Sequence, residues 1–340
     1  MELLVKYSRI SVGVLRVDIR DEISCVHFMN NTLHVGSLHY SPSEKKTDTY
    51  SLASSTLEKT RDVFNRLRLN FKYSGFNMTF HTTNTMISIR ETMEIAEFQN
   101  FEHFYLIGEK FEKEDLDYVM ENVREDQGLH IIQGEIPEDY FHPNFFKFYD
   151  ITYRDARWIR LEHLLSVKDK DVVELGTSNL TQTDMNKYIQ HWIDSEEDLF
   201  SMTRVDLMKG TRINPIILFK DMVALKAKRG NYASWLILPK NPETRKRPIL
   251  WVNWCLDRIS MSTYSIHERP QHDVDPFEPE FPILKTLRRK NDLDNELKTM
   301  GTENHENTRR QTEIRKELQE TIEELHERGV AFHSGMAVML

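Results

Sequence analysis

Metal-ligand residue types are most concentrated in one short stretch of the sequence, "HERPQHDVDPFEPEFP" at 267–282. A metal site needs three or four imidazole or carboxylate donors that converge on one point. Four prolines in this stretch favour an extended chain that keeps such side chains apart. We therefore predict a Pro-rich acidic linker without a metal site, and the alternative is a metal-dependent hydrolase that uses it. The donor residues are His267, Glu268, His272, Asp273, Asp275, Glu278 and Glu280.

A second candidate for chemistry is His191, which lies beside Trp192 in "LTQTDMNKYIQHWI". A general base needs an orienting group and a reactive partner, and the sequence offers neither. The apolar residues of this segment recur at spacings of three and four, which predicts a helix with a buried stripe and with His191 at its flank. Thr181 and Asp184 are typical of an N-cap and a first-turn carboxylate. The stripe residues are Met185, Tyr188, Ile189 and Trp192.

Sequence motifs of the common enzyme classes are missing. No Gly-rich phosphate loop, no H-E-x-x-H helix and no G-x-S-x-G elbow occurs. The two cysteines, Cys25 and Cys255, lack the paired spacing of a zinc or redox motif, which favours a reducing compartment. We therefore predict no catalytic, cofactor-binding or metal-binding residues, no cofactor, and a protein that is not an enzyme.

Composition limits the partners. The chain has 340 residues, of which 39% are hydrophobic, enough for a substantial core. Its formal net charge of -9 gives no general attraction to nucleic acid or to anionic lipid. No stretch approaches the roughly 20 apolar residues that span a bilayer. We expect an intracellular protein, cytoplasmic or nuclear, with no nucleic-acid or membrane partner.

The elements that position these residues follow from hydrophobic periodicity. The first forty residues alternate like a small β meander, and strands then alternate with helices from about Phe76. The segments "HFYLIGEKFEKEDLDYVMENV" and "DVVELGTSNLTQTDMNKYIQHWI" overlay with Leu106 on Leu175 and Val123 on Trp192. The predicted fold class is α/β, an irregular leucine-rich-repeat-like arc of alternating strands and helices, with the N-terminal β meander and a C-terminal helical tail.

Four regions follow from these patterns. Residues 1–75 hold the meander and a helix, and 76–265 form the α/β repeat domain with terminal antiparallel strands. Residues 266–282 are the Pro-rich acidic linker, and 283–340 the charged helical tail. The two leucine-rich stripes of the tail predict a hairpin or short coiled coil that folds back on the body or needs a partner helix.

An aromatic stretch, "DYFHPNFFKFYD" at 139–150, has two interpretations. Exposed, it would be a protein-binding hot spot. Buried, it would be core around a bend at Pro143, which we favour because most aromatic clusters are interior.

The segment "DARWIRLEHLLSVKDKDVVELGTSNLTQTDMNKYIQHWIDSEEDLFSMTRVDL" resembles the type 2 F-box-associated domain of the large nematode F-box family. The tail is also similar to that family in its charged helices followed by Gly329, Val330 and Phe332. The first forty residues lack the three-helix pattern of an F-box. The matching motif positions are Trp158, Leu161, Leu165, Leu180, Thr181, Asp184, Asn186 and Trp192.

This resemblance implies a function. It implies a non-enzymatic protein-recognition module, similar to the substrate-binding part of an F-box-type ubiquitin-ligase adaptor, with an unidentified protein target. The Skp adaptor and a cullin ligase become partners if an F-box is supplied upstream. The alternative is a stand-alone binding or assembly protein with no ligase link.

Overall fold

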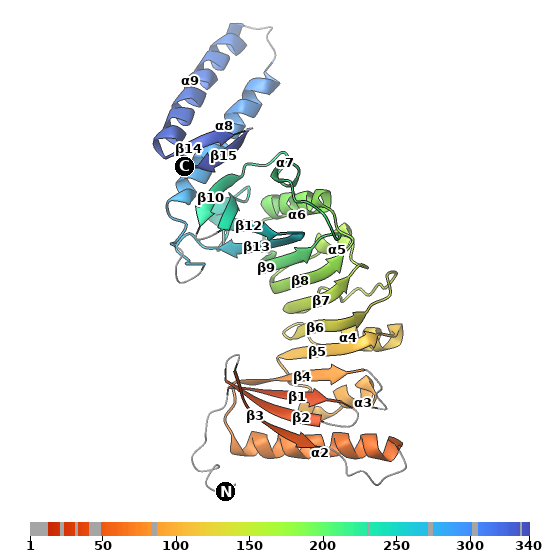
Figure 1. Cartoon of the computed structure of the whole chain (residues 1–340). Coiled ribbons are helices and arrows are strands. Elements are labelled where there is room, and N and C mark those ends of the chain that lie inside the picture. The colour runs from red at the N-terminus through yellow and green to blue at the C-terminus, as the bar shows by residue number, and fades with distance from the viewer. Residues whose placement is uncertain are drawn as a thin grey trace. The chain divides into compact units, whose positions relative to one another are not determined.

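The computed structural model describes residues 13–20, 24–30, 33–40, 49–82, 87–229, 232–270, 275–300, 305–333 and 335–340. These residues form fifteen strands and eight α-helices (Figure 1), which confirms the mixed α/β class. No helix in these ranges is both long and apolar enough to cross a bilayer. The chain divides into two compact units, unit 1 (Met1–Ile159 and Asp171–Asn179) and unit 2 (Arg160–Lys170 and Leu180–Leu340). The four regions predicted from the sequence, with their boundaries, stay predictions.

Unit 1 contains a mixed sheet. Its strands β1, β2 and β3 pair antiparallel, which confirms the predicted meander. From β4 onward each strand pairs parallel with the next one in the sequence, and β1 pairs parallel with β4. In spatial order the strands are β8 (Lys170–Ser178), β7 (Asp150–Ala156), β6 (Gly128–Glu135), β5 (His103–Lys110), β4 (Gly75–His81), β1 (Val14–Ile19), β2 (Ser24–Asn30) and β3 (Leu33–Tyr40).

The helices of unit 1 that the structure describes pack on the apolar face of this sheet. Phe64 of α2 lies 4.8 Å, ring to ring, from Phe76 of β4. Tyr153 of β7 donates a hydrogen bond to Sδ of Met120 in α4, 3.8 Å away. The opposite face of the sheet is polar and is turned away from these helices. The helices are α2 (Thr49–Asn70), α3 (Ile89–Met93) and α4 (Lys113–Asn122).

The aromatic stretch between β6 and β7 is mainly core, as favoured from the sequence. Trp158 is 2% exposed and packs edge-on against Tyr140 and Phe145. Phe141 and Tyr149, in contrast, are exposed. Burial of these rings anchors the long connection that leads into β7.

Unit 2 contains a sheet that is antiparallel except where β10 pairs parallel with β15. The terminal antiparallel strands predicted from the sequence are therefore present, except that the strand-like run NPIILF at 214–219 forms a short helix, which Asn214 caps and Pro215 begins. In spatial order the strands are β14 (Val330–His333), β15 (Met336–Met339), β10 (Leu225–Arg229), β11 (Tyr232–Ile237), β12 (Ile249–Cys255), β13 (Arg258–Tyr264) and β9 (Phe200–Asp206). The helices are α5 (Leu161–Leu164), α6 (Gln182–Asp194), α7 (Pro215–Leu218), α8 (Glu280–Thr299) and α9 (His305–Glu327).

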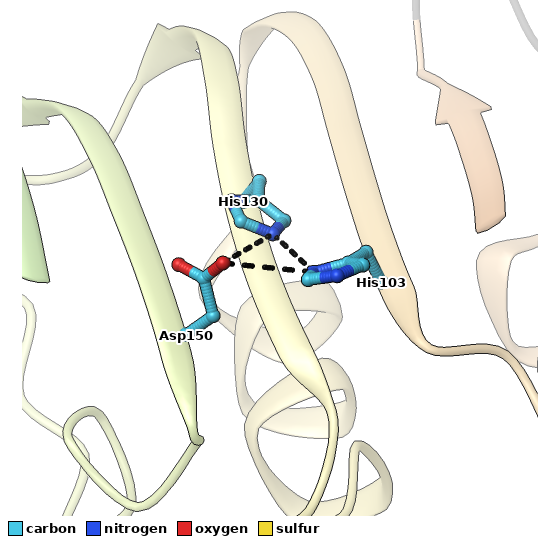
Figure 2. A group of neighbouring side chains, drawn as sticks. All are labelled: His103, His130 and Asp150. Atoms are coloured by element: carbon cyan, nitrogen blue, oxygen red, sulfur yellow. Dashed lines mark hydrogen bonds and ion pairs between the residues drawn. The ribbon is translucent and has the colours of Figure 1, made fainter. Parts of the chain in front are cut away.

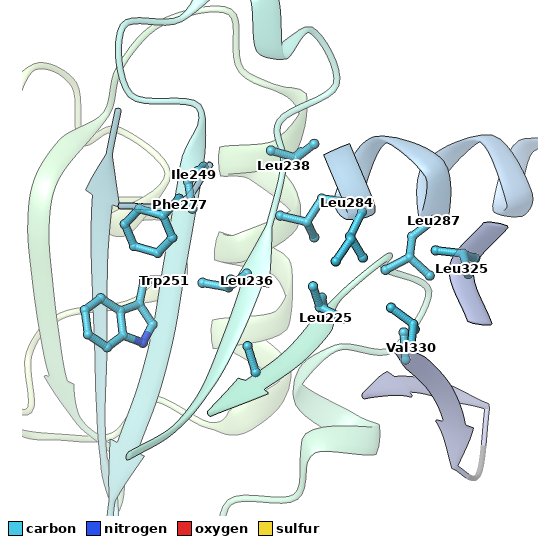
Figure 3. Close-up of a cluster of buried hydrophobic side chains, with 13 residues drawn as sticks. Leu225, Leu236, Leu238, Ile249, Trp251, Phe277, Leu284, Leu287, Leu325 and Val330 are labelled. Carbon is cyan, nitrogen blue, oxygen red and sulfur yellow. The ribbon is translucent and has the colours of Figure 1, made fainter. Parts of the chain in front are cut away.

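The helical tail belongs to the core of unit 2. Leu284 and Leu287 of α8 pack with Leu225 and Leu236 of the sheet and with Leu325 of α9 (Figure 3). Helices α8 and α9 pair with each other, so each covers part of the other's leucine stripe. The tail therefore folds back on the body, one of the two outcomes expected from its sequence.

Part of the predicted linker is also core. The Phe277 side chain is fully buried beside Trp251, and the Glu280 side chain is 8% exposed. Arg229 donates hydrogen bonds to both carboxylate oxygens of Glu280, at 2.8 and 2.7 Å. An acidic linker exposed to solvent is therefore wrong at these two positions, because Phe277 packs against Trp251 and Glu280 has a buried cationic partner in Arg229.

Candidate functional site

Helix α6 begins at the residues that the sequence suggested. The Thr181 hydroxyl accepts a hydrogen bond from the Asp184 backbone N–H at 3.2 Å, and the Asp184 carboxylate accepts one from the Thr181 backbone N–H at 2.9 Å. This reciprocal pair is a capping box, which satisfies two backbone donors at the helix start. The polar residues Thr181 and Asp184 therefore have a structural role here.

Asn186, a family-motif position to which periodicity assigned no role, joins two elements. Its Nδ2 donates hydrogen bonds to the carbonyl oxygens of Leu218 and Lys220, at 3.0 and 3.1 Å. These carbonyls lie at the end of the short helix α7, where helical partners are lacking. Asn186 thus fixes α7 against α6.

Trp192 is buried in unit 2, and the guanidinium of Arg245 lies over its ring. The Arg245 guanidinium lies 4.5 Å from the ring centroid and donates a hydrogen bond to the Trp192 carbonyl oxygen at 2.6 Å. His191 is half-buried at the flank of the helix, as expected from the spacing. Trp192 and Arg245 therefore pack together.

The remaining motif residues, one tryptophan and three leucines, have largely apolar side chains. Trp158 donates its indole N–H to the Asp155 carbonyl oxygen at 3.1 Å, and Leu180 is 2% exposed. In α5 the buried residue is Leu164, whereas Leu161 and Leu165 are half-buried. These motif residues therefore contribute mainly to packing.

The linker residues proposed from the sequence do not converge where the structure describes them. His267 contacts Glu278, with 2.6 Å between Nδ1 and Oε1, while Glu268 accepts a hydrogen bond from the Ser265 backbone. Glu280 is bound to Arg229. His272 and Asp273 lie outside the described residues. Among the described members of this group, His267 and Glu278 thus contact each other, whereas Glu268 and Glu280 have partners outside the group.

A different set of polar residues converges on unit 1. The polar sheet face is the face of β1 and β4–β8 opposite the helices. Strand register places Asn77, His103 and Gly128 side by side, and Thr79, Tyr105 and His130 in the next row. We define the face by Arg16, Asp18, Asn77, Thr79, His103, Tyr105, His130, Asp150, Thr152 and Arg154.

The polar sheet face is held by contacts between neighbouring strands. Arg16 donates a hydrogen bond to Thr79 Oγ1 at 3.1 Å, and its guanidinium lies 5.6 Å from the Tyr105 ring centroid. The Tyr105 ring stacks on His130, with centroids 4.5 Å apart and planes 14° apart. Polar side chains on five adjacent strands thus form a continuous surface.

The centre of the polar sheet face is a cluster of His103, His130 and Asp150 (Figure 2). Nδ1 of His103 lies 2.9 Å from Nε2 of His130. Oδ2 of Asp150 lies 3.8 Å from the first of these atoms and 4.0 Å from the second. Among the residues described, this is the group whose His and acidic ligand atoms lie within 4.8 Å of one another.

Burial sets the protonation of this cluster. It lowers the pKa of His130 to about 3, with a further contribution from His103, and it lowers the pKa of His103. Burial, followed by repulsion from Asp171 and Glu174, raises the pKa of Asp150 to about 6. Both imidazoles are therefore neutral at pH 7, which leaves a nitrogen lone pair on each available as an acceptor.

Sequence reasoning missed this cluster because its members are 20 to 47 residues apart. His103 and Asp150 are the first residues of β5 and β7, and His130 is the third of β6. Alternation predicts which face each residue occupies, but only strand register decides that the three meet.

The fold and this surface define unit 1 as a two-layer α/β unit with one polar sheet face, and unit 2 carries most of the family motif. Residues 137–198 match the family described as F-box associated. This segment runs from the aromatic connection to just beyond the end of α6, and its similarity to the family suggests a protein-interaction module. No curated protein and no solved structure matches the chain.

Proposed function

We propose that this protein is a non-enzymatic, intracellular recognition module that holds a target protein for an F-box-type ubiquitin ligase. The observation that carries the proposal is the F-box-associated match at 137–198. The Skp adaptor and a cullin are the partners proposed for the ligase link. A stand-alone binding or assembly protein is the alternative.

The polar sheet face is the proposed target-binding surface. Successive parallel strands β4–β8 present side chains from every strand on one face, like the binding faces of repeat proteins. Tyr105 supplies half-buried ring surface there, and Arg154 is an exposed cation. Aromatic and arginine side chains contribute most to protein interfaces. We also propose that the alternating strands and helices form an irregular repeat arc, in which neighbouring repeats stack through their apolar faces.

The ligase link is tested by affinity purification of the full-length protein from its natural cells. Co-purification of the Skp adaptor and a cullin is expected. Their absence would reject the ligase role and leave the stand-alone binding module.

The target-binding surface is tested separately by charge reversal. Arg154→Glu changes an exposed residue of the polar sheet face, and the matched control Arg66→Glu changes an exposed residue of α2. Proteins that bind through the face should be lost from Arg154→Glu and kept by Arg66→Glu in quantitative mass spectrometry. Equal recovery by both variants would place target binding elsewhere.

A further inference from the structure

We propose that His103, His130 and Asp150 bind a divalent transition-metal ion of the zinc class, with one coordination position left open. The three residues come from the adjacent strands β5, β6 and β7 and point to one location on the polar sheet face (Figure 2). Two imidazoles and one carboxylate are a donor set that zinc and similar ions use, whereas Mg²⁺ and Ca²⁺ prefer oxygen ligands.

The separations between the donor atoms fit a single ion. Ligands about 2.0–2.1 Å from a tetrahedral ion lie roughly 3.3 Å from one another. The distances from Asp150 Oδ2 to the two imidazole nitrogens are 3.8 and 4.0 Å, and the distance between the nitrogens is 2.9 Å. Shifts of about half an ångström, within reach of side-chain torsions, bring all three to bonding positions.

The backbone beneath the cluster places no side-chain atom among the donors. Gly128 lies between His103 and Asp150 in the strand register. A Cβ atom at this position would lie 2.9 Å from Nε2 of His130 and closer still to Nδ1 of His103. A glycine here thus keeps the space between the donor atoms free of side-chain atoms.

A neighbouring hydroxyl orients one of the ligands. Nδ1 of His130 lies 2.9 Å from Thr152 Oγ1. A His130 imidazole that donates its Nδ1–H to Thr152 presents the Nε2 lone pair to the ion, and such contacts usually fix the tautomer of metal-binding histidines. His103 then needs its proton on Nε2, so that its Nδ1 lone pair points at the same ion.

The carboxylate and its surroundings favour a cation. Oδ1 of Asp150 is buried and has no hydrogen-bond partner among the described residues. Asp171 and Glu174 add negative charge near Asp150. An ion would offset the energetic cost of this buried carboxylate. The His103 side chain is 32% exposed, so a fourth ligand, water or a donor from a bound molecule, has access.

The test is zinc binding to the untagged full chain after chelator treatment. Titration of ZnCl₂ followed by calorimetry should give one site per chain, and added Zn²⁺ should raise the melting temperature. The variants His103→Ala and Asp150→Asn should weaken binding by at least about a hundredfold, because each removes a ligand. Thr152→Val should weaken it by about ten- to a hundredfold, because it removes only the orienting contact.

A matched control comes from the linker, where His267 is 79% exposed and contacts Glu278. His267→Gln should bind zinc like the unmodified chain. Circular dichroism confirms that each variant is folded, and a variant that fails this check is replaced by Gly128→Ala, which blocks the ion and keeps every donor. The proposal is overturned if the unmodified chain binds no zinc, or if folded His103→Ala and Asp150→Asn bind it equally well.

Discussion

At the scale of single residues, a motif position and a buried ion pair have clear structural roles. Asn186 binds the last carbonyls of α7, and Arg229 binds Glu280 beneath the start of α8. Each contact joins parts of the chain more than thirty residues apart. Loss of Asn186 removes the donor to the part-buried Leu218 carbonyl, and loss of Glu280 leaves the buried Arg229 without its carboxylate; an unpaired buried group costs more than the bond itself contributes.

Asn186→Ala should lower the free energy of unfolding by about 1–3 kcal/mol, because two backbone carbonyls lose their donor. Urea denaturation measures this loss. The neighbouring exposed residue provides the control, and Lys187→Ala should change stability by less than about 0.5 kcal/mol. Equal effects of the two substitutions would show that Asn186 does not hold α7.

Glu280→Ala should lower the free energy of unfolding by about 3–5 kcal/mol, because it leaves the Arg229 charge buried without a carboxylate. The two side chains are only 5% and 8% exposed. The exposed pair of Lys285 and Glu243 is the comparison, and Glu243→Ala should cost less than about 1 kcal/mol. Thermal unfolding of both variants measures the difference, and a small effect at Glu280 would contradict a structural role for the buried pair.

His81 should make the stability of unit 1 depend on pH. Burial, followed by repulsion from Arg20, lowers its pKa in the folded state below the usual 6.5. The unfolded chain therefore takes up a proton first, and stability falls as pH drops from about 6.5 through the folded pKa. His81→Leu should remove this pH dependence. The free energy of unfolding of the variant should therefore rise relative to that of the unmodified chain as the pH is lowered from 7.5 to 5. A pH-independent difference in denaturation midpoint would contradict this.

At the scale of elements, helix caps are formed by residues that are close in the sequence, whereas strand register brings together residues that are far apart in it. The capping box of α6 is local, because Thr181 and Asp184 are three residues apart. Helix α9 likewise ends before Gly329, whose φ of 76° lies in the left-handed region that glycine favours. The polar sheet face, in contrast, depends on the register of β5, β6 and β7.

Thr181→Ala should destabilise unit 2 by about 1 kcal/mol, because the first turn of α6 loses its side-chain acceptor. Thr183 lies within the same turn and is exposed, so Thr183→Ala is a matched control with an expected change near zero. Chemical denaturation of both variants provides the measurement. A larger loss from Thr183→Ala would mean that the cap does not determine the stability of this helix.

At the scale of the whole molecule, the chain divides into two compact units, and the helical tail is part of unit 2. Ile283, Leu284 and Leu287 are nearly fully buried against the sheet, and β15 pairs with the edge of β10. The tail therefore covers apolar surface and a strand edge that would otherwise favour aggregation.

Deletion of residues 280–340 should abolish cooperative unfolding of unit 2, because it exposes Leu225, Leu236 and Trp251. Calorimetry and light scattering are the measurements, and aggregation is the expected result. In the control, a short Gly-Ser loop replaces residues 297–311, which keeps the buried residues of α8 and α9. That variant should unfold cooperatively. A soluble, cooperative product of the full deletion would show that the tail is dispensable.

The sequence alone determined the features that depend on neighbours in the chain. These include the α/β class, the meander, the capped helix that follows Thr181 and the core role of most of the aromatic stretch. Periodicity and capping act over a few residues, so their effects can be predicted without knowledge of the whole fold. The F-box-associated motif lies within one such continuous segment.

Only the tertiary structure decided which donors converge. The sequence drew attention to the linker around His267, where the donors are close in the chain, yet of the described ones only His267 and Glu278 meet, and Glu268 and Glu280 have partners outside the group. His103, His130 and Asp150 are far apart in the chain and meet because three parallel strands align in one register over Gly128. A slip of one residue in either pairing would turn a donor to the opposite face, so pairing between distant strands, which no local pattern encodes, creates the cluster.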